Sequence, residues 1–129
     1  SVVKDPKLLL TIMDNIFLAL TYAMSSVLHY ERIYKRVPAF ADNFESKLEI
    51  FKTKVAPKYN IDDSYIKLME KIKDIILEHK KSPVEFVRGK KFVICNNSYK
   101  MRTITVEEIK DYVKNTKQFL KETEAIIKK

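Results

Sequence analysis

The residues best suited to catalysis lie where a long apolar segment ends, in the sequence His-Tyr-Glu-Arg at positions 29–32. An imidazole beside a guanidinium can serve phosphodiester chemistry, so a nuclease using His29 and Arg32 is one hypothesis. Arg36 follows one helical turn after Arg32. No second His or Cys stands at catalytic spacing, and a His bonded to a neighbour at the boundary of a helix bundle is a simpler interpretation. We therefore assign no catalytic residue and expect a protein that is not an enzyme.

Three more residues carry reactive groups without a partner nearby in the sequence. Asp14, inside the apolar segment, is either a buried acid with a shifted pKa or the partner of a basic residue on another helix. Basic neighbours can lower the pKa of the Cys95 thiol, but a small, half-buried strand residue is the simpler interpretation. His79 fits the C-terminus of a helix, where the helix dipole favours it. A single Cys excludes an intramolecular disulfide and a Cys-based zinc cluster, so we expect no metal and no cofactor.

The positive charge of the chain is concentrated in one segment. The net charge is +8, and residues 79–102 contribute +6 of it through seven basic residues and one acidic residue, Glu85. The basic residues are Lys80, Lys81, Arg88, Lys90, Lys91, Lys100 and Arg102. Lys and Arg displace the counterions of phosphates, and an exposed ring of Phe86, Phe92 or Tyr99 could stack on a base. The segment therefore predicts a non-enzymatic module that binds a nucleic acid or another polyanion.

Two alternative roles for this basic segment stay open. In the first, Phe92 and Ile94 anchor a hairpin to the core, and the lysines only keep an exposed sheet edge from aggregating. In the second, the basic residues bind an acidic protein or an anionic lipid surface. A pI near 9.5 supports an electrostatic role but does not distinguish between these partners.

The longest apolar segment, residues 8–28, has one charged residue, Asp14. An Asp-Pro pair in front of it caps a helix that we expect over 5–36, ended by Pro38. The segment is long enough to span a bilayer, but Asp14 and several hydroxyl residues disfavour this, so we expect no membrane span.

A helix that is apolar on all sides packs on its own helices, on a dimer partner, or on both. The alternative function is therefore a structural protein that forms a homodimer through this helix, without a nucleic-acid role. An unknown protein partner is a further possibility.

Helical spacing of apolar residues predicts three more helices. The expected ranges are 40–56, stopped by Pro57, then 62–79, and a last helix that begins at Thr105 and continues to about 127. Thr105 and Glu108 match a capping box, in which each side chain bonds a free backbone N–H at the helix start.

A change of period before the last helix predicts a β-hairpin, with strands over 91–95 and 99–104. At 129 residues we expect one domain, 1–129, with a basic hairpin insert at about 84–104. The predicted fold class is all-α, an antiparallel bundle of about four helices with the hairpin before the C-terminal helix. The single Cys and the lack of a signal peptide favour a cytoplasmic location. Abundant Lys, Glu and Ile favour a thermophilic source, although an AT-rich genome leaves the same signature.

Overall fold

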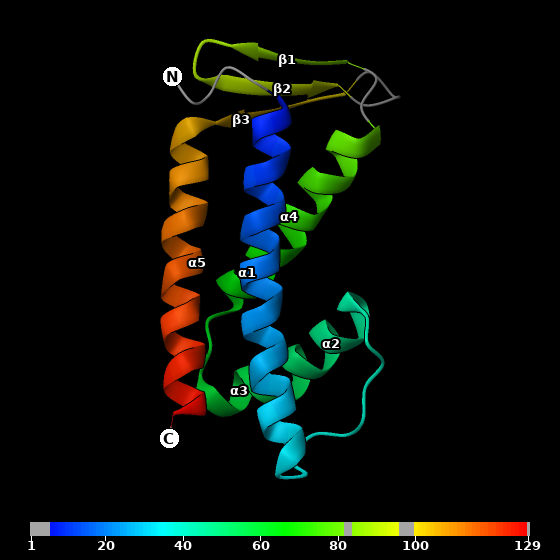
Figure 1. The fold of residues 1–129 in the computed structure, drawn as a ribbon, viewed down its shortest axis with the longest axis vertical. Helices are drawn as coiled ribbons and strands as arrows, with labels where there is room; N and C mark the ends of the chain where they lie inside the picture. Colours follow the sequence, from blue (N-terminus) through cyan, green and yellow to red (C-terminus); the bar gives the residue numbers. More distant parts are fainter. Residues whose placement is uncertain (1–5, 82–83, 96–99, 129) are drawn as a thin grey trace.

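Helix α1 (Pro6–Ile33) lies at the centre of the molecule, and α4 and α5 pack along it, as Figure 1 shows. The structure is a computed structural model that describes residues 6–81, 84–95 and 100–128. The other elements, in chain order, are α2 (Phe44–Ile50), the π-helical turn η1 (Phe51–Val55), α3 (Ala56–Tyr59), α4 (Asp63–Lys81), β1 (Val84–Arg88), β2 (Lys91–Cys95), β3 (Met101–Thr105) and α5 (Val106–Ile127). The prediction of a mainly helical protein with a hairpin before the last helix is confirmed.

The three long helices alternate in direction. Helix α1 runs away from the sheet, α4 runs back toward it, and α5 runs away again, so α1 and α5 lie parallel (Figure 1). Consecutive long helices are therefore antiparallel, as expected. The second helical segment (α2, η1 and α3) is short and lies across the end of the bundle (Figure 1). It is therefore not a fourth long helix, and with three long helices alternating in direction the first and the last are parallel.

The second helical segment continues past Pro57 rather than stopping there. A π-turn ends at Val55, and α3 then starts at Ala56 with Pro57 in its first turn. Pro lacks the backbone N–H, and the first turn of a helix tolerates this loss because its N–H groups have no intrahelical partner. The segment ends at Asn60, which has a left-handed backbone with φ of 59°. Its start is at Phe44 instead of residue 40, capped by Asn43, whose side chain accepts the Ser46 N–H at 2.8 Å.

Helix α1 ends at Ile33, five residues before Pro38. Lys35 takes a left-handed conformation with φ of 55°, and the Arg36 N–H donates to the Glu31 carbonyl at 2.9 Å. This is the hydrogen-bond pattern of a Schellman motif, which turns the chain out of the helix. The end of the helix is thus determined by this cap and not by the proline.

Three antiparallel strands, in the order β1-β2-β3, cover one end of the helices (Figure 1). The predicted hairpin is β2 and β3, and β1 is an additional strand that the sequence pattern did not predict. Arg88 pairs with Lys91, so the β1–β2 turn has only two residues, the first of which is Gly89 with φ of 63°. Two-residue hairpin turns require positive φ at this position, and glycine adopts it without strain, so Gly89 suits the turn.

The inner face of the sheet is part of the core. Phe92, Ile94 and Ile104 are buried and belong to the same apolar cluster as the helices. Phe92 pairs with Ile104 across β2 and β3, so both side chains point to the same face. Thr105 ends β3 and caps α5 by accepting the Glu108 N–H at 3.1 Å, which confirms one half of the predicted capping box. The Glu108 carboxylate accepts from the Thr105 hydroxyl at 3.3 Å. The sheet is therefore fixed to the bundle by its apolar face and by the chain itself, which continues from β3 into α5 without a loop.

We expect Phe92→Ala to lower the free energy of unfolding by about 3–5 kcal/mol, because it removes a buried ring that joins the sheet to the helices. Thr103→Ala, on the exposed face of the same sheet, is the control and should change stability by less than about 0.5 kcal/mol. Urea denaturation followed by circular dichroism measures both. Equal, small effects of the two substitutions would show that the sheet is not anchored through Phe92.

Candidate polyanion-binding surface

The face of the sheet that points away from the helices is built by strand alternation. Neighbouring residues of a strand point to opposite faces, so burial of Phe92 and Ile94 turns Lys91 and Val93 outward. On β3, Thr103 pairs with Val93 and is exposed on the same outer face. We call this the outer sheet face, and define it by Arg88, Lys91, Val93, Met101 and Thr103.

A shallow hollow of about 390 Å³ lies on the outer sheet face and is lined by these five residues. Arg88 and Lys91 supply two exposed positive charges. Val93 is buried, whereas the Met101 side chain beside it is 68% exposed. None of the five lining residues carries a carboxylate. The hollow therefore combines positive charge, a hydroxyl group and apolar surface.

The predicted basic residues lie at both ends of the sheet. Arg88, Lys90 and Lys91 are exposed at and beside the β1–β2 turn. Lys80 and Lys81 are exposed in the last turn of α4, whose chain leads into β1 at the other end of the sheet. Lys100, exposed just before β3, lies at that same end because Met101 pairs with Cys95.

Arg102 differs from the other predicted basic residues because it faces inward. Its Nε donates to Glu78 Oε2 at 2.6 Å, and its Nη2 donates to Glu78 Oε1 at 3.0 Å. The hydrogen bonds from this carboxylate raise the pKa of Arg102 above its usual value. A bidentate pair of this kind is among the stronger side-chain interactions, and here it joins β3 to α4. Arg102 is thus a tether of the sheet, with its charge already matched by Glu78.

The predicted aromatic contacts are only partly described. Phe92 is buried against the helices and is not an exposed ring, as the hypothesis of an anchored hairpin expected. The side chain of Phe86 and the whole of Tyr99 lie outside the described residues. The exposed apolar group of the outer sheet face is Met101, which the sequence pattern did not indicate.

Of the residues considered for catalysis, His29 and Arg32 lie close together against the Phe40 ring, whereas Asp14 and Cys95 lie elsewhere. The His29 ring lies 5.5 Å from the Phe40 ring, and the Arg32 guanidinium lies 5.6 Å from the same ring. Asp14 and Cys95 are half-buried on different elements. Within the described ranges, no group of three or more His, Cys, Asp or Glu side chains is placed to hold a metal ion.

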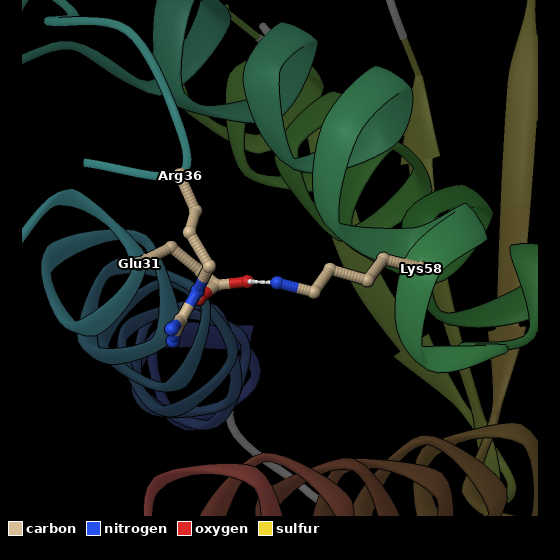
Figure 2. Close-up of polar contacts among 3 residues, drawn as sticks. All are labelled: Glu31, Arg36 and Lys58. Atoms are coloured by element: carbon tan, nitrogen blue, oxygen red, sulfur yellow. Dashed lines mark hydrogen bonds and ion pairs between the residues drawn. The ribbon is translucent and has the colours of Figure 1, made fainter. Parts of the chain in front are cut away.

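Among the residues whose burial the structure describes, the most buried charged side chain is Glu31, next to the two residues first considered for chemistry. Its exposed fraction is 1%, and Figure 2 shows its carboxylate between Arg36 and Lys58. The Arg36 Nε donates to Glu31 Oε2 at 2.5 Å, and the Lys58 Nζ donates to Glu31 Oε1 at 2.9 Å. Arg36 also lies 4.6 Å from the Tyr34 ring. Glu31 thus joins the end of α1 to α3, across 27 residues of sequence.

The ionised form of Glu31 is favoured by its partners. Burial by itself would raise the pKa of this carboxyl, but hydrogen bonds from Lys58, Tyr59 and Arg36 outweigh it and hold the pKa below its usual value. A buried carboxylate needs such compensation, because an unpaired buried charge is strongly destabilising. A group kept ionised in this way is suited to an anchor and not to a proton donor at neutral pH. Sequence pattern gave no sign of this role, because two of the partners come from a different helix.

We expect Glu31→Gln to lower the free energy of unfolding at pH 7 by about 2 kcal/mol, the range for a hydrogen bond to a charged group. Because folding lowers the pKa of Glu31, its contribution is present above the unfolded-state pKa and is lost as the pH falls through the folded-state pKa. The difference between the two proteins should therefore shrink in acid. Glu107→Gln, in an exposed i,i+3 pair with Lys110, is the matched control and should change stability by less than about 1 kcal/mol. Thermal melts from neutral to acid pH measure this, and a pH-independent difference would contradict the assignment.

Comparison of the chain with protein-family models, with curated proteins and with solved structures finds no match. Inference about function therefore rests on the chemistry of the described residues. Two exposed surfaces lie outside the helical core described above: the basic outer sheet face, and a part of α1 that includes Leu18 and Tyr22 and carries no charge. The buried carboxylate of Glu31, in contrast, is accounted for by the fold itself.

Proposed function

We propose that this protein binds a nucleic acid or another polyanion on the outer sheet face. The observation that carries the proposal is the hollow in which Arg88 and Lys91 lie beside the exposed Met101, with no carboxylate among the lining residues that the structure describes. Two cations on one open face can neutralise phosphates without first breaking an ion pair within the hollow. Their placement on strands holds them in a defined spacing, since the sheet is anchored to the core.

The remaining basic residues extend this surface. With Arg102 matched by Glu78, six basic residues of the segment are exposed to solvent. They are Lys80, Lys81, Arg88, Lys90, Lys91 and Lys100. A five-residue strand is about 13 Å long at ~3.3 Å per residue, so basic residues at its two ends can contact separate phosphates of one polymer. The expected ligand is therefore an extended polyanion rather than a single phosphate group.

The recognition would depend mainly on the backbone of the polymer. Lys and Arg release condensed counterions when they neutralise phosphates, which gives affinity without sequence specificity. Met101 and the Thr103 hydroxyl add a small apolar and hydrogen-bonding surface between the charges. A single strand can turn its bases toward such a surface, so we expect single-stranded nucleic acid to bind at least as well as duplex.

The test is a fluorescence-anisotropy titration with labelled single- and double-stranded DNA and RNA. About six phosphate contacts would make the affinity fall roughly a thousandfold between about 50 and about 200 mM salt. The double substitution Arg88→Glu, Lys91→Glu should weaken binding at least about tenfold and lower the slope of log affinity against log salt by about two, one for each lost contact.

Lys52→Glu with Lys54→Glu is the matched control. Both lysines are exposed on η1, far from the sheet, and the substitution changes the net charge by the same amount. It should leave the affinity much closer to that of the unaltered protein. Equal weakening by the two pairs would mean that only net charge matters. Absence of binding at low salt to nucleic acid, together with binding to an acidic protein or anionic vesicles, would contradict the proposal in favour of those partners.

A further inference from the structure

Helix α1 exposes a face without charge, which no other long helix of the described chain does. Between positions 8 and 30 its single charged residue is the half-buried Asp14. Leu18 and Tyr22, one turn apart, are nevertheless 45% and 67% exposed. The exposed residues of α4 and α5, in contrast, are mostly Lys, Asp and Glu. In a chain that is 33% charged, this exposed stretch of α1 is an exception that folding does not require.

A hollow of about 550 Å³ lies beside this face, between α1 and α5. On the α1 side it is lined by Tyr22 and by the small residues Ala19, Ala23 and Ser26. Leu120 and Ile127 contribute apolar side chains from α5. The two charged residues of the lining, Glu124 and Lys128, form an ion pair with each other. The hollow is therefore apolar in its centre, and its charges are matched at one end.

A projection and a hollow thus adjoin on the same face: Leu18 stands out next to the hollow, and the exposed Tyr22 forms part of its wall beside Ala19 and Ala23. We propose that a second copy of this chain docks here, around a two-fold axis, and that each copy inserts Leu18 and Tyr22 toward the hollow of the other. A two-fold contact brings identical surfaces together, so residue i of one copy meets residue j of its partner and the reverse. A face with both shapes side by side satisfies this condition.

The charge of the molecule favours the same location. Two copies that each carry +8 repel one another, and a two-fold contact brings like charges of the two copies close together near its axis. An uncharged face avoids this cost, whereas the basic end of the molecule does not. The required size means that the contact is not confined to α1: residues 8–30 extend about 35 Å, or roughly 350 Å² in flat projection at a helix width of about 10 Å, so the interface must also cover the α5 side of the hollow. A stable interface buries about 800 Å² of accessible surface on each partner.

A lipid bilayer is the competing occupant, because α1 is long and apolar enough to cross a membrane by length and composition. Only a third of its most apolar window is buried within the chain. Asp14, however, lies one turn from Leu18, and a carboxylate in hydrocarbon is costly. A protein interface at Tyr22 and Ser26 can leave Asp14 at its wet edge, so the second copy fits the face better.

The experiment is sedimentation equilibrium of the whole chain from about 1 to about 100 µM, a range that includes the dissociation constants of moderate homodimers. We expect twice the chain mass of 15.2 kDa for the unaltered protein. Leu18→Glu should raise the dissociation constant at least about a hundredfold, because the two-fold axis brings in two carboxylates for one substitution. Leu77→Glu is the matched control: Leu77 is 42% exposed on α4, close to the 45% of Leu18, and should leave the dimer intact.

Circular dichroism first verifies that both variants are folded, which their exposed positions favour. A monomer at every concentration overturns the proposal, and so does a dimer that Leu77→Glu dissociates while Leu18→Glu does not. A third outcome is a monomer that floats with vesicles of neutral phosphatidylcholine and loses this binding in Leu18→Glu. This result would overturn the dimer and show that a membrane covers the face. The readout is independent of polyanion binding, so failure here and failure of the proposed function are distinguishable.

Discussion

Burial of one side of α1 against both α4 and α5 is the interaction on which the rest of this structure depends. Met13, Leu20, Met24 and Leu28 are inaccessible to solvent, and they bring together two helices that have few contacts with each other. The other elements complete this core from the ends. Phe51 of η1 packs edge-to-face on Phe119 of α5, with ring centroids 5.9 Å apart. Because these elements do not cover all of α1, a stripe that includes Leu18 and Tyr22 is left exposed.

Charged residues have two separate roles in this molecule, and burial distinguishes them. Glu31 with Arg36 and Lys58 fixes the end of α1 to α3, and Glu78 with Arg102 fixes the sheet to α4. In both groups the donor–acceptor distances are 2.5 to 3.0 Å, and the carboxylate belongs to a helix. Arg88 and Lys91, on the other hand, lie on an open strand face, and none of the described residues that line its hollow carries a carboxylate. Basic residues of the same segment thus differ in whether they pair with a carboxylate of the core helices, and the face of the strand on which each residue lies decides this.

Sequence pattern predicted the helices well and their ends less well. Apolar spacing is a property of consecutive residues, so α4 and α5 and the cap at Thr105 could be located directly. The ends at Ile33 and Tyr59 depend on left-handed residues, Lys35 and Asn60, that replace the expected stops at Pro38 and Pro57. A lysine rarely adopts this conformation, and a π-turn leaves no simple signature in sequence. The strand β1 was missed because Gly89 interrupts the apolar pattern, and its place in a two-residue turn becomes clear only from the pairing of Arg88 with Lys91.

The sequence by itself determined the helical class, the hairpin of β2 and β3, and the accumulation of positive charge in residues 79–102, since all three are local patterns of residue type. Only the tertiary structure decided which of these charges face solvent. The inward direction of Arg102 follows from the register of β3 with β2, and its partner Glu78 comes from 24 residues earlier in the chain. Glu31 likewise finds Lys58 only after α3 has packed against α1. Pairing of this kind depends on distances in the folded chain, and the spacing of residues along the sequence does not give those distances.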